Sequence, residues 1–79
     1  MSNITVKFKE GTYIARSATG VWRYSNEDMR PIEATKKTGY WMSPHNAITG
    51  LINTKIFDVN NFPTVNEPDW KKTKFRVGD

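Results

Sequence analysis

The sequence predicts a small, mainly β protein of five to six strands, built as a barrel or a strongly bent antiparallel sheet with one short helix at residues 44–53. Residues 4–9, ITVKFK, alternate apolar and polar side chains, which is the period of a strand with one buried face. Residues 21–24, VWRY, form a β-branched and aromatic run directly after turn-forming residues. An α+β sheet with the helix packed on one face is the alternative.

Turn residues and strand composition predict the remaining strands. Residues 12–17 form a hairpin with residues 21–24, and these two strands with the strand at 4–9 make a meander. Pro31 follows the polar residues 25–28 too closely for a helix, so a loop or a 3₁₀ turn is expected there. We expect further strands at residues 32–37, 55–59 and 70–77, with a loop rich in Asn and Pro at 60–68 that turns Phe62 inward.

The helix prediction depends on a start signal and an apolar stripe. Ser43 can cap a helix, and Pro44 is well suited to its first position. The apolar residues at positions 47, 48, 51 and 52 would share one side of that helix. Gly50 weakens the prediction because glycine lowers helix stability in the interior.

The length of 79 residues predicts one domain, residues 1–79, with a small core. Aromatic residues are 13% of the chain, so large rings should supply most of the buried area. A core of this size contributes only about 3–5 kcal/mol net. A homodimer or a bound partner would therefore matter to stability.

Cysteine is absent, which excludes disulfides and cysteine-based metal sites. This favours a reducing compartment, and we expect a cytoplasmic protein, in the host cytoplasm if it is phage-encoded. The first residues, MSNITVKFKEG, contain no long apolar run. We therefore expect neither a signal peptide nor a membrane partner.

The positive charge is concentrated near the end of the chain. The net charge is +4, from 12 basic and 8 acidic residues, and four of the bases lie within residues 70–77. On a strand, one face of this segment would carry Trp70 and three cations, while Phe75 and Val77 would pack against the sheet. Charge gathered on one element attracts polyanions better than the same charge spread evenly.

A cationic face with an aromatic ring predicts non-enzymatic binding of nucleic acid. Cations neutralise phosphates, and exposed rings stack on unpaired bases, which favours RNA or single-stranded DNA over duplex. A recognition helix, an RNP1 motif and a zinc finger are all absent from the sequence. The predicted binding residues are Trp70, Lys72, Lys74 and Arg76, with Lys7, Lys9 and Arg23 at the margin.

The alternative is a small inhibitor or adaptor that binds an acidic surface of a larger protein machine. Small β domains bind partners by adding a strand at a sheet edge or through aromatic pockets. Phage-encoded host-takeover and anti-defence proteins are often small, cysteine-free chains of this kind. Lysines on an exposed strand also serve simply to block aggregation of sheet edges.

Catalytic and cofactor motifs are not found. His45 is the single histidine, and its neighbour Ser43 lacks the acid and the strand–turn–helix context of a nucleophile. One histidine with scattered carboxylates does not supply a metal site. The isolated glycines match no phosphate-binding loop. We therefore expect no enzymatic activity and no cofactor.

Overall fold

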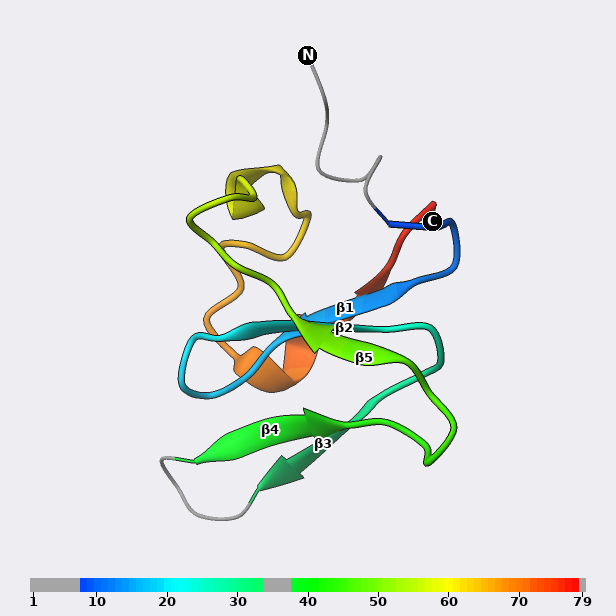
Figure 1. The fold of residues 1–79 in the computed structure, drawn as a ribbon. Helices are drawn as coiled ribbons and strands as arrows, with labels where there is room; N and C mark the ends of the chain where they lie inside the picture. Colours follow the sequence, from blue (N-terminus) through cyan, green and yellow to red (C-terminus); the bar gives the residue numbers. More distant parts are fainter. Residues whose placement is uncertain (1–7, 34–37, 79) are drawn as a thin grey trace.

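A computed structural model describes residues 8–33 and 38–78, and within them the chain forms six short antiparallel strands in two open sheets (Figure 1). The four-stranded sheet has the order β5-β2-β1-β6, and β3 and β4 form a separate hairpin. Two isolated 3₁₀ turns complete the secondary structure of the described residues. The elements are β1 (Tyr13–Arg16), β2 (Trp22–Ser25), β3 (Arg30–Glu33), β4 (Gly39–Met42), β5 (Thr49–Leu51), η2 (Val59–Asn61), η3 (Trp70–Lys72) and β6 (Phe75–Arg76).

The mainly β prediction is confirmed, while the closed barrel and the α+β alternative are wrong. Closure would require the β3–β4 hairpin to pair with an edge of the larger sheet. The hairpin instead lies against one face of that sheet, so both sheets stay open (Figure 1). Strands of two to four residues also leave too little ladder to close a barrel.

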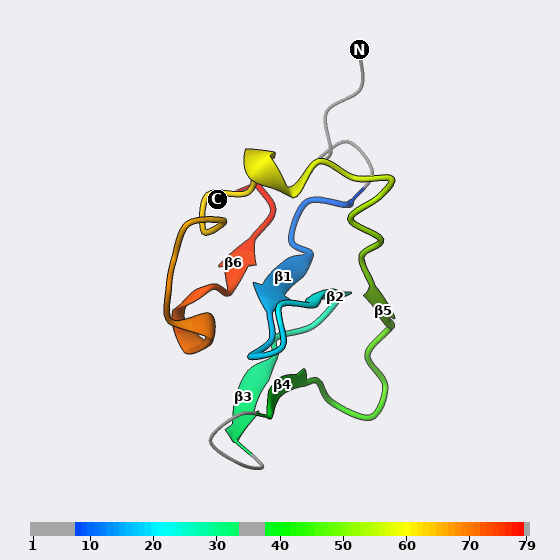
Figure 2. The same cartoon turned by 90° about the vertical axis from the view of Figure 1, so that its left-hand side faces the viewer.

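The inner strand β1 pairs with β2, which follows it directly, and with β6, the last strand of the described chain. Ile14 pairs with Tyr24 of β2 on one side and with Phe75 of β6 on the other. In Figure 2, β5 and β6 therefore lie at opposite edges of the four-stranded sheet. The sequence predicts a further strand at residues 4–9. Residues 4–7 lie outside the described part, and residues 8 and 9 are not in a strand.

Each face of the four-stranded sheet is covered by its own hydrophobic cluster. The alternation of β1 sends Ile14 to one face and Ala15 to the other, and both are fully buried. The first core contains Ile14, Trp22, Ile52, Phe62 and Val77. The second core contains Ala15, Met29 and Trp41, with Tyr13 and Trp70 packed against them.

The long connection between β5 and β6 closes the first core. Phe62 follows η2 and is 2% exposed, as the sequence predicts. Its ring meets the edge of the Trp22 ring with a centroid distance of 5.0 Å. The strand expected at residues 55–59 is wrong, because this stretch forms a turn that leads into η2, where the Asp58 carboxylate accepts a hydrogen bond from the Asn60 amide.

The helix predicted at residues 44–53 is wrong, because residues 49–51 form β5 and pair with β2. Gly50 lies directly under the Tyr24 ring: a Cβ there would come within 2.6 Å of the ring atom Cε2. Glycine in a strand marks such a close approach. Ile48 and Leu51 are 68% and 65% exposed, whereas Ile52 is buried in the first core, so the residues of the expected apolar stripe do not share one buried side.

One expected hairpin is confirmed, and one other expected strand is displaced along the sequence. The hairpin expected from residues 12–17 and 21–24 is confirmed as β1 and β2. The strand expected at 32–37 begins earlier, as β3 at residues 30–33, and residues 34–37 lie outside the described part.

Candidate functional site

The carboxy-terminal segment, residues 70–77, is not the single strand that the sequence predicts. It begins as η3, capped by the Asp69 carboxylate, which accepts a hydrogen bond from the Lys71 amide at 3.0 Å. Thr73 then fixes the segment to β1. Its buried hydroxyl accepts a hydrogen bond from the Arg16 amide at 2.9 Å and lies 2.7 Å from the Trp70 carbonyl oxygen. Only Phe75 and Arg76 remain as a strand, so the predicted cationic strand face does not form.

Trp70 turns inward, toward the hairpin. Its ring lies against Gly39 of β4, where a Cβ would come within 2.6 Å of the ring atom Cη2. The ring also meets Trp41 edge-on, with a centroid distance of 6.0 Å. Trp70 is thus half-buried and packs against the second core. Support of the hairpin, rather than stacking on a base, is the role that this position favours.

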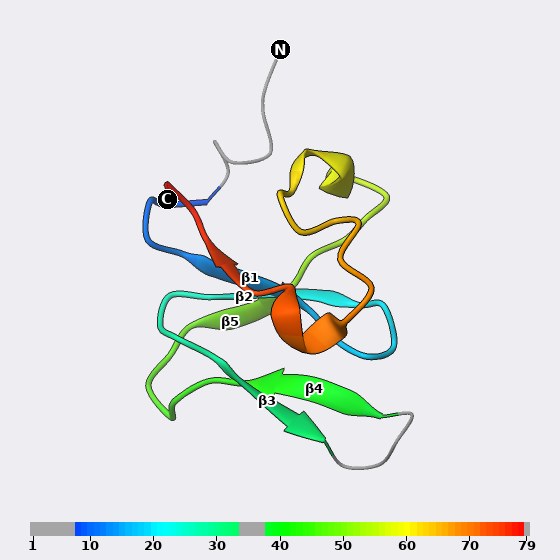
Figure 3. The same cartoon turned by 180° about the vertical axis from the view of Figure 1, so that it is seen from behind.

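Two lysines of the segment bind carboxylates near the two ends of the hairpin strand β3: Asp28 just before it and Glu33 as its last residue. The Lys71 ammonium lies 2.6 Å from the Glu33 carboxylate, and the Lys74 ammonium lies 2.7 Å from the Asp28 carboxylate. Lys74 also donates to the Met29 carbonyl at 3.0 Å. In Figure 3 the η3 turn of the segment lies between the larger sheet and the hairpin, and these ion pairs connect the segment to the hairpin.

One group of each ion pair, Asp28 and Lys71, has a shifted pKa. The hydrogen bond from Lys74 holds the pKa of the Asp28 carboxyl below its ordinary value of 3.8. The hydrogen bond to Glu33 raises the pKa of the Lys71 ammonium. Both pairs are largely exposed, and surface ion pairs of this kind contribute little to stability.

The other predicted binding residues do not all lie on one face. Arg76 stacks over the Tyr13 ring at 5.9 Å from its centroid. Lys72 and Lys9 are exposed. Arg23 belongs to β2, where it is paired with Ala15 and Leu51, and the strand β1 lies between β2 and β6. Lys7 lies outside the described residues. The register and contacts place four predicted residues on the second-core face of the sheet: Arg23, Trp70, Lys74 and Arg76. Lys9 borders a hollow with Thr12 and Tyr24 on the opposite face, so the structure brings together only part of the predicted site.

A different surface, missed by the sequence prediction, lies at the free edge of the four-stranded sheet. We call it the β5 edge and define it as residues 48–51. It exposes two large apolar side chains, Ile48 and Leu51. The sequence carries little signal for it, because residues 48–52, Ile-Thr-Gly-Leu-Ile, do not alternate apolar and polar side chains.

A hollow adjoins the β5 edge on each face of the sheet. The Leu51 hollow has a volume of about 350 Å³ and the Ile48 hollow about 280 Å³. The Leu51 hollow is lined by Ser17, Thr19, Val21, Arg23, Thr38, Gly39, Tyr40 and Leu51. The Ile48 hollow is lined by Phe8, Lys9, Thr12, Tyr24, Asn26 and Ile48. Each hollow combines apolar side chains with one cation.

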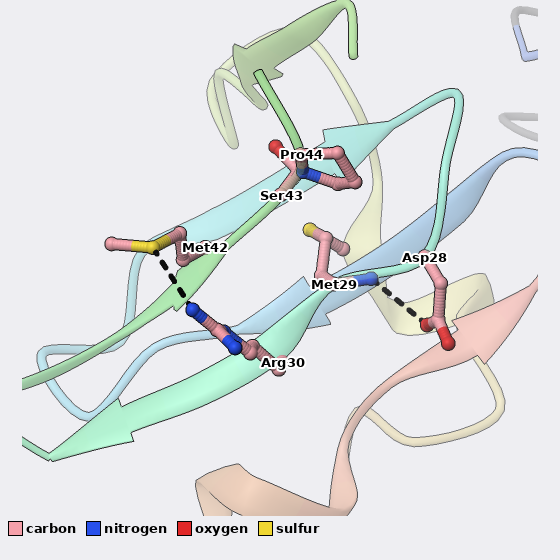
Figure 4. Close-up of a pocket in the computed structure, with 6 residues that line it drawn as sticks. All are labelled: Asp28, Met29, Arg30, Met42, Ser43 and Pro44. Atoms are coloured by element: carbon pink, nitrogen blue, oxygen red, sulfur yellow. Dashed lines mark hydrogen bonds between the residues drawn. The ribbon is translucent and has the colours of Figure 1, made fainter. Parts of the chain in front are cut away.

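A third hollow, of about 400 Å³, lies beside the hairpin (Figure 4). Its lining includes Met29 and Met42, and the Arg30 guanidinium approaches the Met42 sulfur at 4.0 Å. The Asp28 carboxylate also lines it, but already accepts hydrogen bonds from the Met29 amide and from Lys74. Ser43 lines this hollow, but His45 does not. The hollow thus presents a methionine-lined wall and a carboxylate that is already occupied.

Residues 8–33 and 38–78 contain neither a cluster of metal ligands nor a membrane-spanning helix. No group of three or more His, Cys, Asp or Glu side chains in this part of the chain could hold a metal ion. No helix in the same residues has the length and apolar character needed to cross a membrane.

Comparison with protein family models, with curated proteins and with solved structures gave no match. The function is therefore inferred from this chain's own residues.

Proposed function

We propose that this chain is a non-enzymatic protein-binding module, a small inhibitor or adaptor that docks onto an acidic surface of a larger protein. The observation that carries the proposal is the β5 edge. Ile48 and Leu51 remain about two-thirds exposed on a free sheet edge, at 68% and 65%. Proteins usually block such edges, and a free edge can bind a partner by accepting an additional strand.

The positions of the carboxy-terminal cations support a protein partner over nucleic acid. A phosphate that approached Lys71 or Lys74 would have to displace Glu33 or Asp28 first. Aliphatic side chains such as those of the β5 edge bury against protein but offer no ring for base stacking. The net charge of +4 favours an acidic partner, because complementary charge speeds and orients association.

Affinity purification from the native cell, with and without nuclease and at low and high salt, tests the proposal. A stoichiometric complex with an acidic protein that survives nuclease is the expected result. A preparation that absorbs strongly at 260 nm and loses its partner to nuclease or salt would contradict it. The experiment uses the unsubstituted chain, so its outcome does not depend on how the partner docks.

Binding of RNA or single-stranded DNA is the second proposal, supported by the pairing of a ring with a cation in the Leu51 hollow. Tyr40 is 40% exposed there beside Arg23, and Lys72 and Lys9 are exposed elsewhere on the surface. The proposed contacts are the seven sequence-predicted residues: Trp70, Lys72, Lys74, Arg76, Lys7, Lys9 and Arg23.

Charge reversal at exposed lysines tests this second proposal. Lys72→Glu combined with Lys9→Glu leaves both ion pairs of the hairpin intact. We expect weaker binding to a single-stranded oligonucleotide and a shallower dependence of affinity on salt, since fewer counterions are released. Unchanged affinity at low salt in a folded variant would exclude these lysines as contacts.

A further inference from the structure

We infer that the β5 edge takes up an extended, acidic strand of the partner protein, which adds to the sheet next to β5. The inference rests on the proposed function and specifies its docking mode. In this mode, backbone hydrogen bonds supply affinity and side-chain pockets supply specificity. The β5 edge offers both components.

The backbone component follows from the hydrogen-bond pattern between β2 and β5. The Ile52 amide donates to the Trp22 carbonyl at 2.9 Å, and the Asn26 amide donates to the Ile48 carbonyl at 3.1 Å. Pairs in an antiparallel ladder alternate between bonded and non-bonded. Thr49 and Leu51 therefore point their amides and carbonyls away from β2. No described strand lies on that side, because β5 ends the sheet order (Figure 2).

The pocket component follows from the two hollows. Leu51 and Ile48 lie on opposite faces of the sheet, and each lines a hollow on its own face. Successive side chains of a strand point to opposite faces. A strand paired with β5 would thus send alternate side chains into the Leu51 hollow and the Ile48 hollow.

The charge of the hollows identifies the chemistry of the partner strand. Arg23 lines the Leu51 hollow and Lys9 lines the Ile48 hollow, while no Asp or Glu lines either one. A second copy of this chain would bring the same two cations to the same edge, together with a further net charge of +4. An acidic strand with apolar side chains matches the edge better than a second copy does.

The two edges of the sheet are protected differently. At the opposite edge, β6 carries Arg76, and the Thr64 hydroxyl donates to the Thr73 carbonyl just before β6. At the β5 edge, the strand sequence Thr49-Gly50-Leu51 contains no charged residue and no proline. Natural edges are normally blocked by lysine, proline or a bulge. The unblocked edge is thus the one suited to accept another strand.

A synthetic peptide of about six residues that alternates valine with glutamate is a suitable probe, since this is the length of a typical strand. Calorimetry on the full chain would compare it with a peptide that has lysine for glutamate and with one N-methylated along the backbone edge. Thr49→Pro removes an outward amide and spares the ladder to β2. Thr54→Pro is the matched control, placed in the exposed turn that follows β5.

We expect saturable binding of the valine–glutamate peptide, weakened about tenfold or more by Thr49→Pro and unchanged by Thr54→Pro. The lysine peptide and the N-methylated peptide should bind at least about tenfold more weakly. Hydrogen exchange at the Thr49 and Leu51 amides should slow when the peptide is bound.

Several results would overturn the inference. They are absence of peptide binding, equal binding of the N-methylated peptide, or equal binding by Thr49→Pro. Protection of the Thr49 and Leu51 amides in the free protein would show that the edge is already covered. A dimer in sedimentation that Thr49→Pro dissolves would assign the edge to a second copy. If the native complex forms equally well with Thr49→Pro, the docking mode fails while the proposed function stands.

Discussion

The contact between Gly39 and Trp70 predicts that Gly39→Ala destabilises the protein. The backbone at Gly39 has no positive φ, so alanine is compatible with the local conformation and only the ring opposes it. A Cβ at this position would lie 2.6 Å from Cη2 of Trp70, whereas ordinary contacts begin at 3.4 Å. The ring must therefore withdraw by at least the difference of 0.8 Å.

The size of the effect follows from two opposing contributions. Overpacking of a well-packed site costs about 1–3 kcal/mol. Replacing glycine by alanine restricts the unfolded chain and offsets about 0.5–1 kcal/mol of that cost. A net loss of about 1–2 kcal/mol should lower Tm by about 4–16 °C in a domain of this size.

Urea denaturation followed by tryptophan fluorescence measures this loss, and a double-mutant cycle identifies its source. In a Trp70→Leu background, Gly39→Ala should cost less than about 0.5 kcal/mol, because the opposing ring is gone. A neutral Gly39→Ala in the wild-type background would refute the reasoning. It would mean that the Trp70 ring does not pack on β4.

Three other predictions concern the core, a buried hydroxyl and an ion pair. Phe62→Ala should cost about 3–5 kcal/mol, enough to unfold much of the protein at 37 °C by circular dichroism, and a folded variant would contradict its place in the first core. Thr73→Val should cost about 1–3 kcal/mol in urea denaturation, because the Arg16 amide loses its acceptor, and a neutral result would contradict that bond. The pKa of Asp28 is lowered in the folded state, so its contribution is present above the ordinary value of 3.8 and is lost as pH falls through the folded pKa. Asp28→Asn should therefore lower stability slightly at pH 7 and leave it unchanged at the acid end, while an equal loss at both pH values would exclude the pair with Lys74 as the cause.

The elements that could be predicted from the sequence are those with local signals. The β1–β2 hairpin could be predicted because a glycine turn lies between two runs of β-branched and aromatic residues. The burial of Phe62 could be predicted because it is an aromatic residue in an otherwise polar loop. The region around Gly50 was mispredicted because Ser43 and Pro44 imitate a helix start. Its strand conformation depends on pairing with β2 and on the Tyr24 ring, which are distant in sequence.

The candidate site shows the same limit. The positive charge of the carboxy-terminal segment is evident from composition, but its ion pairs depend on where the fold places Asp28 and Glu33. Strand alternation alone put Trp70 on the cationic face, while the cap at Asp69 rotates it toward the hairpin. A two-residue strand carries too little pattern to be recognised in a sequence.

The pairing of β6 with β1 has a consequence for how the chain acquires its structure. Ile14 pairs with Phe75, so β1 receives its second neighbour only after the roughly 60 intervening residues have been synthesised. Until then Trp22 and the rest of the first core lack Val77. Pairings of such high sequence separation slow folding, and the unfinished sheet has an additional open edge during that time. The nascent chain should therefore depend on a chaperone during the interval between the synthesis of β1 and that of β6.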